Sequence, residues 1–195
     1  DSINIILKTG IVFGVICTTY CYINAPLILS YWLGEVNENG VNILRMTILV
    51  FPFYTFSSLT RSPIDAVSER GYNSLIYGLS AVVLFVIIFI GKLLDFNLLN
   101  TALAGFITSH IVAGFLSGYY VHKFYQNKLC NFELLRDILF CTSLIFLINH
   151  FFSYINISAV FQLFITSIIY VIIGIILFKY SKTSWLTELK SNLYA

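Results

Sequence analysis

Apolar residues dominate this chain in six long stretches, which short polar connectors separate. Each stretch has about 17–24 residues, enough for an α-helix rising 1.5 Å per residue to cross the ~30 Å hydrocarbon core of a bilayer. The pattern therefore predicts an all-α, polytopic membrane protein in which residues 1–195 form a single membrane domain. The predicted spans cover residues 10–33, 43–61, 74–94, 98–121, 134–154 and 157–178.

The composition agrees with this pattern. Hydrophobic residues make up 58% of the chain and charged residues 10%, whereas a soluble domain has about 25% charged residues. The net charge of +2 and the lack of a basic stripe argue against nucleic acid as a partner. Membrane lipids are the expected surroundings.

Lysine and arginine residues alternate between the two sides of the predicted membrane. Arg45 and Lys92 face one side, and the other nine of the 11 basic residues face the opposite side. By the positive-inside rule the side with nine is cytoplasmic, so both ends of this segment are expected in the cytoplasm. Tyr31 and Trp32 lie at the outer end of the first span, as an aromatic belt would. The nine are Lys8, Arg61, Arg70, Lys123, Lys128, Arg136, Lys179, Lys182 and Lys190.

Small residues recur every four positions along residues 98–121. Such spacing lets helix backbones approach closely, so tight helix packing is the simplest interpretation, and helix sliding during transport is compatible with it. One row holds Gly105, Ser109, Ala113 and Ser117, and a second holds Gly114 and Gly118.

Two prolines fall inside predicted spans. Pro26 follows Asn24 in the first span and Pro52 lies in the second. A proline removes one backbone hydrogen bond and can kink its helix. Inside a membrane the freed carbonyl needs a partner or a water-lined cavity, so Asn24 is a possible cavity-lining residue.

Arg45 and His110 are the main candidates for a binding site, because polar groups inside a membrane are costly to bury. Arg45 lies at the outer entrance of the second span. It can extend to lipid headgroups, or face inward and hold an anionic substrate such as a phosphate. His110 is expected near mid-depth, either as a neutral, hydrogen-bonded histidine or as a cavity-lining or proton-coupling group.

Asn149, His150 and Gln162 are further possible cavity-lining residues, although a wetted interface or a bond to a neighbouring helix also explains them. The sequence contains no HExxH, P-loop, GxSxG or CxxC motif. We therefore expect no catalytic residues, no metal and no cofactor, and a protein that is not an enzyme.

Four short segments carry a resemblance to a known family. The segments are PLILSYWLG (26–34), VNILR (41–45), PIDA with RG (63–71) and FNLLNTALA (96–104). In order and spacing they resemble the C-terminal half of bacterial polysaccharide and O-antigen repeat-unit flippases, which belong to the MATE-like multidrug/oligosaccharidyl-lipid/polysaccharide exporter superfamily. Asn97 and Asn100 depart from the pattern, standing where glycines are usual in that family.

The resemblance implies one six-helix lobe of a two-lobed transporter in the bacterial inner membrane. The chain begins at Asp1 rather than Met, which fits the expectation of an N-terminal six-helix lobe upstream. The implied cargo is an undecaprenyl-diphosphate-linked oligosaccharide, an O-antigen or capsule repeat unit for lipopolysaccharide or capsule biosynthesis. It would be flipped to the periplasmic leaflet by alternating access, with H⁺ or Na⁺ as coupling ion. Arg45 would contact the diphosphate, and His110 would line the cavity or couple the ion.

Other function classes remain open from the sequence. A MATE-type small-molecule exporter would more naturally carry an intramembrane carboxylate, and no Asp or Glu lies deep in a predicted span. A multi-spanning membrane enzyme of polysaccharide assembly would need larger loops than the connectors found here. A non-catalytic membrane scaffold is the fourth class.

Overall fold

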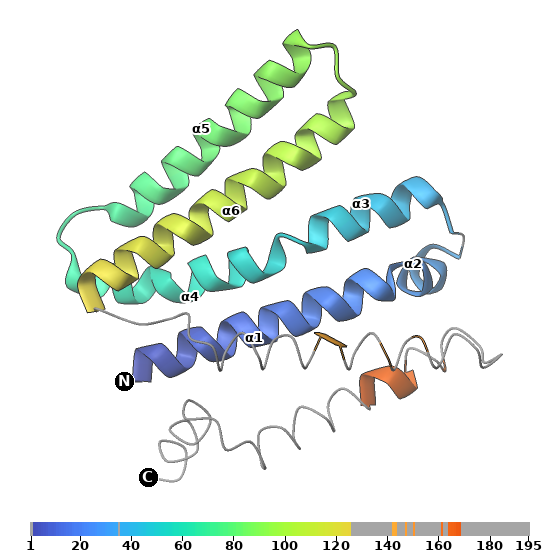
Figure 1. Cartoon of the computed structure of the whole chain (residues 1–195), viewed down its shortest axis with the longest axis horizontal. Helices are drawn as coiled ribbons and strands as arrows, with labels where there is room; N and C mark the ends of the chain where they lie inside the picture. The colour runs from blue at the N-terminus through green and yellow to red at the C-terminus, as the bar shows by residue number, and fades with distance from the viewer. Residues whose placement is uncertain are drawn as a thin grey trace.

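The computed structural model describes residues 2–34 and 36–125, together with residues 142, 143, 147, 150, 161 and 164–168. The described residues form helices and turns, with no β-strand among them. Figure 1 shows the helices running roughly along one another. They are α1 (Ser2–Ile23), α2 (Ala25–Leu33), α3 (Glu38–Ile48), α4 (Phe51–Val67), α5 (Tyr72–Leu93) and α6 (Leu98–Tyr125).

Four helical segments are long and apolar enough to cross a membrane. Each of the first four predicted spans falls on one of them, so the described part of the chain is helical and is consistent with a membrane protein. The predicted spans 134–154 and 157–178 lie outside the described residues, except for the few helical positions given above. The four segments are Ile6–Ile23, Glu38–Val67, Tyr72–Leu93 and Leu98–Tyr125.

The predicted bounds of the first two spans need correction. The first helix begins at Ser2 and is interrupted at Asn24, so residues 10–33 are not one continuous helix. The second segment begins at Glu38, pauses at residues 49–50 and continues to Val67. The interruptions precede Pro26 and Pro52, whose missing N–H groups weaken the helical ladder. The helices extend beyond the predicted bounds through turns that mix polar with apolar residues, among them Leu7 and Ile64.

The helices pack as two antiparallel pairs that meet where α6 lies on α4. Helix α5 lies along α6, α1 lies along α4, and α4 also packs on α6 (Figure 1). The turns at 34–37 and 94–97 lie at one end of the bundle, here called the turn end. The turn at 68–71 and the last residues of α6 lie at the opposite end, here called the basic end.

The buried core lies toward the basic end. There α1, α4, α5 and α6 bury a cluster of apolar side chains against one another. A second, smaller cluster between α2 and α3 lies at the turn end, formed by Ala25, Leu29 and Val41 with Leu44 packed against them. The core cluster consists of Leu7, Phe56, Ile64, Ile76, Ala113 and Val121.

Candidate functional site at the two proline breaks

The first break, between α1 and α2, exposes a carbonyl that Arg45 satisfies. Pro26 has no N–H, so the carbonyl of Tyr22, four residues earlier, loses its helical donor. Arg45, in the last turn of α3, donates from Nε to that carbonyl oxygen at 3.2 Å. The guanidinium carbon also lies 5.4 Å from the centre of the Tyr22 ring. Arg45 is thereby fixed to the end of α1.

The rest of the Arg45 guanidinium stays available. Within the described part of the chain, Nη1 and Nη2 have no hydrogen-bond or ion-pair partner, and the side chain is half-buried. Two parallel N–H donors on a planar cation match the oxygens of a phosphate or carboxylate. The site can therefore hold an anion without giving up its bond to Tyr22.

Asn24 occupies the break itself. Its side chain is 1% exposed, and Nδ2 donates to the carbonyl oxygen of Tyr20 at 2.9 Å. Its own backbone carbonyl accepts from the N–H of Ile28 at 2.9 Å. The structure therefore brings Asn24 and Arg45 to the same break, with the Asn24 amide engaged by the helix backbone.

At the second break, between α3 and α4, a side chain again donates to a carbonyl that a proline has left without its helical donor. Here α1 supplies the donor and α3 the carbonyl. Pro52 leaves the carbonyl of Ile48 without its helical donor, and Thr18 of α1 donates from Oγ1 to that oxygen at 3.2 Å. Sequence reasoning missed Thr18. Counting back four residues from the proline identifies the acceptor, but the donor lies 30 residues away along the chain.

His110 lies against Tyr54 in the first turn of α4 and against Phe106 of its own helix. Its Nδ1 is 2.9 Å from the carbonyl oxygen of Phe106. Because a carbonyl only accepts, we assign the proton to Nδ1, which leaves Nε2 as an acceptor in the neutral ring. The ring also contacts those of Phe106 and Tyr54, at centroid distances of 4.5 and 6.2 Å. The structure does not place His110 beside Arg45.

The small residues of α6 face two different neighbours. A Cβ added at Gly105 would lie 3.0 Å from Cδ1 of Leu84 on α5, and one at Gly114 would lie 3.0 Å from Cδ1 of Phe53 on α4. These glycines therefore allow α6 to approach α5 and α4 at once. The other predicted packing residues are buried or half-buried on the same helix: Ser109, Ala113 and Gly118.

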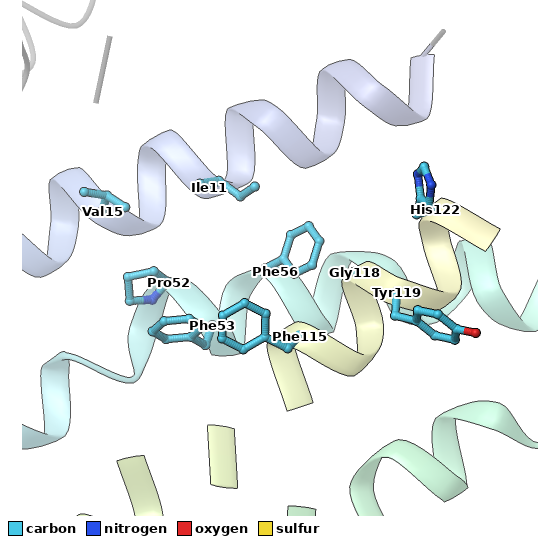
Figure 2. A pocket seen from close by; sticks show the side chains of 10 residues that line it. Ile11, Val15, Pro52, Phe53, Phe56, Phe115, Gly118, Tyr119 and His122 are labelled. Atoms are coloured by element: carbon cyan, nitrogen blue, oxygen red, sulfur yellow. The ribbon is translucent and has the colours of Figure 1, made fainter. Parts of the chain in front are cut away.

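A cavity of about 550 Å³ lies between α1, α4 and α6 (Figure 2). Its walls are apolar and aromatic, with His122 near the end of α6. Neither Arg45 nor His110 lines it, whereas the predicted packing residues Gly114 and Gly118 do. The proline and aromatic residues of its wall are Pro52, Phe53, Phe56, Phe115 and Tyr119.

The remaining predicted site residues fall in the last third of the chain. Asn149 and Gln162 lie outside the described residues, and His150 is helical with an exposed side chain. The hydroxyls of Tyr20 and Ser167 lie 2.7 Å apart, which places residues 164–168 beside α1. Among the residues described, no three His, Cys, Asp or Glu side chains converge as metal ligands.

No known protein family matches the chain, and no match is found among curated proteins or solved structures. The function is therefore argued from the residues and their geometry.

Proposed function

We propose that this chain is a lobe of a membrane transporter that flips an undecaprenyl-diphosphate-linked oligosaccharide from the cytoplasmic to the periplasmic leaflet of a bacterial inner membrane. Two features support the proposal. The sequence resembles repeat-unit flippases over residues 26–104, and the described helices are long and apolar enough to span a bilayer. Both ends of the segment would be cytoplasmic, with the turn end of the bundle periplasmic.

The observation that carries the proposal is the state of Arg45. Its Nε is bound to the Tyr22 carbonyl and its plane lies near the Tyr22 ring, while Nη1 and Nη2 have no partner among the described residues. A cation held in this way has already lost much of its side-chain freedom, so less entropy is lost when it binds. A diphosphate is a ligand of matching charge and geometry.

His110 is the second residue to which the proposal gives a role. With Nδ1 donating to the Phe106 carbonyl, its Nε2 is the atom that could accept from a cargo hydroxyl or take up a coupling proton. In the proposed transporter, Arg45 contacts the diphosphate, and His110 serves the cavity wall or the coupling ion.

The test separates the charge of Arg45 from its bond to Tyr22. In Arg45→Gln, the amide nitrogen takes the position of Nε along the side chain, so a donor remains but the charge is lost. In Arg45→Lys the charge remains. If Arg45 binds a diphosphate, export of repeat units to the cell surface should fall about ten-fold or more in Arg45→Gln, as expected for losing a charged hydrogen bond. Arg45→Lys should keep a larger share.

Arg61→Gln is the matched control, because the Arg61 side chain is exposed at the basic end. Its export should stay near that of the unaltered protein. Unchanged export in Arg45→Gln, at equal protein level in the membrane, would remove Arg45 from the proposed diphosphate site.

A further inference from the structure

Helices α2 and α3 form a hairpin that joins the rest of the bundle through two proline breaks. The two helices pack on each other through their own small apolar cluster. Gly34, with φ of +75°, ends α2 in the left-handed conformation that turns the chain toward α3. The hairpin is entered at Asn24–Pro26 and left at residues 49–52. Each connection therefore lacks a backbone hydrogen bond that a continuous helix would have.

Two side-chain hydrogen bonds tie this hairpin to α1. Thr18 of α1 donates to the carbonyl of Ile48 on α3, and Arg45 of α3 donates to the carbonyl of Tyr22 on α1. Residues three or four apart are neighbours on a helix surface. Thr18 and Tyr22 are four apart, and Arg45 and Ile48 are three apart. The two bonds are therefore adjacent and run in opposite directions between the same two helices.

We propose that Thr18 and Arg45 form a reciprocal latch that holds the α2–α3 hairpin against α1, and that the hairpin swings about its two proline breaks when both bonds open. Each helix supplies a donor to the carbonyl that the proline following the other helix has left without one. The latch uses Nε of Arg45 and the proposed cargo contact uses Nη1 and Nη2, so the latch does not depend on the cargo.

The chemistry of the latch favours the closed hairpin while permitting its release. A carbonyl left without a donor inside a membrane is unfavourable, which favours closure. Interhelical hydrogen bonds in membranes are nevertheless weak on average, so two of them can open in a conformational change. Because they are neighbours between the same helices, loss of one should weaken the other.

The other side of the second break is held firmly. A Cβ added at Gly14 would lie 3.0 Å from Cα of Pro52 and 2.7 Å from Oγ1 of Thr55. This contact brings the start of α4 against α1, beside the point where Thr18 reaches Ile48. Helix α4 is therefore held on α1 by close packing, whereas α3 contacts α1 through the two hydrogen bonds and also packs on α6.

The latch can be tested by measuring distances between two spin labels in the full chain, purified in membrane-like nanodiscs. The labels go on Asn39→Cys at the start of α3 and Asn100→Cys at the start of α6, both at exposed positions. The four native cysteines are first replaced by alanine. We expect one distance in the unaltered protein and a second, resolved distance in Thr18→Val and in Arg45→Met. The double variant should reach the same second distance.

Matched variants separate the latch from general destabilisation. Thr18→Ser and Arg45→Gln keep a donor at the required atom and should show the single distance. Thr19→Val removes a hydroxyl that bonds within α1, to the carbonyl of Val15, and should also show the single distance. A second distance in Thr19→Val equal to that in Thr18→Val would overturn the proposal.

Replacing Pro52 tests directly whether Thr18 substitutes for the missing backbone donor. Pro52→Ala restores an N–H that can donate to the Ile48 carbonyl, so adding Thr18→Val to it should no longer produce the second distance. Persistence of that distance would show that Thr18 does not replace the missing donor. Unchanged distances in both Thr18→Val and Arg45→Met would also overturn the latch. None of these measurements involves cargo, so failure of the transport proposal would be seen separately.

Discussion

The two antiparallel helix pairs of this bundle differ in continuity. In the continuous pair, α5 and α6 run for 22 and 28 residues without an internal proline. In the broken pair, the α1–α2 and α3–α4 segments are each interrupted just before a proline. Figure 1 shows α5 and α6 as two unbroken ribbons, whereas α2 turns away from the direction of α1.

The two pairs also differ in the acceptors to which their serine and threonine hydroxyls donate. In the continuous pair, Ser80 and Thr108 donate to the carbonyls of Ile76 and Ala104, four residues earlier in their own helices. In the broken pair, Thr19 also donates within its own helix, to the carbonyl of Val15. Thr18 instead donates across to the carbonyl of Ile48, which Pro52 has left without its helical donor. A carbonyl whose helical donor is missing is a strong acceptor for a side chain of the neighbouring helix. At this break, the proline thus provides an acceptor for an interhelical hydrogen bond from Thr18.

The largest expected effect comes from separating the broken pair at its closest approach. Gly14→Leu places side-chain atoms where Pro52 and Thr55 already lie, and such overpacking costs about 3 kcal/mol. For a chain of this length, the melting temperature in detergent should fall by about 6–12 °C.

Gly78→Leu is the control in the continuous pair, because a Cβ at Gly78 meets nothing within 4 Å. Its melting temperature should stay close to that of the unaltered protein. Equal losses in the two variants would show that Gly14 is not a specific contact between α1 and α4.

A smaller effect is expected for an interhelical bond to a carbonyl that no proline has freed. The hydroxyl of Tyr125 on α6 donates to the carbonyl of Pro63 at 2.8 Å, and that carbonyl lies inside α4, four residues before Val67. Tyr125→Phe should cost about 1 kcal/mol, or about 2–4 °C in melting temperature. Tyr77→Phe, on the exposed face of α5, should have no measurable effect. An equal fall in melting temperature in Tyr77→Phe would show that the bond to Pro63 does not stabilise the fold.

The smallest effect is expected for a hydroxyl that bonds within the continuous pair. Ser80→Ala loses the bond to the Ile76 carbonyl, but alanine has the higher helix propensity, and the two terms should nearly cancel. The change should be below about 0.5 kcal/mol by thermal unfolding. A loss as large as that of Tyr125→Phe would mean that the comparison between local and interhelical hydroxyls does not hold.

The sequence predicted the first four helices because runs of apolar residues of this length have few other folds in a membrane. It predicted both prolines as kink positions because each removes a backbone hydrogen bond from its helix. It missed the helix ends, since residues 2–9 and 62–67, which mix polar with apolar side chains, continue as helix beyond the predicted spans. Hydropathy marks the membrane-buried part of a helix, and the remainder depends on caps such as Asn37, whose side chain accepts from the N–H of Asn39 at 2.9 Å.

The candidate site was predicted as residues but not as an arrangement. Arg45 and Asn24 were selected because each is polar within or beside an apolar span, and the structure brings both to the first break. His110 was selected on the same ground, yet it lies against Phe106 and Tyr54. Polarity indicates that a buried group needs a partner and does not identify the partner.

The sequence by itself determined that the chain has membrane helices, where their apolar stretches lie, and which two carbonyls, those of Tyr22 and Ile48, lose a helical donor. These follow from local chemistry, because a proline acts on a residue four positions away. Only the tertiary structure decided that Arg45 and Thr18 supply the missing hydrogen bonds. These donors lie 23 and 30 residues from their acceptors, and such separations are closed only by the packing of α3 against α1.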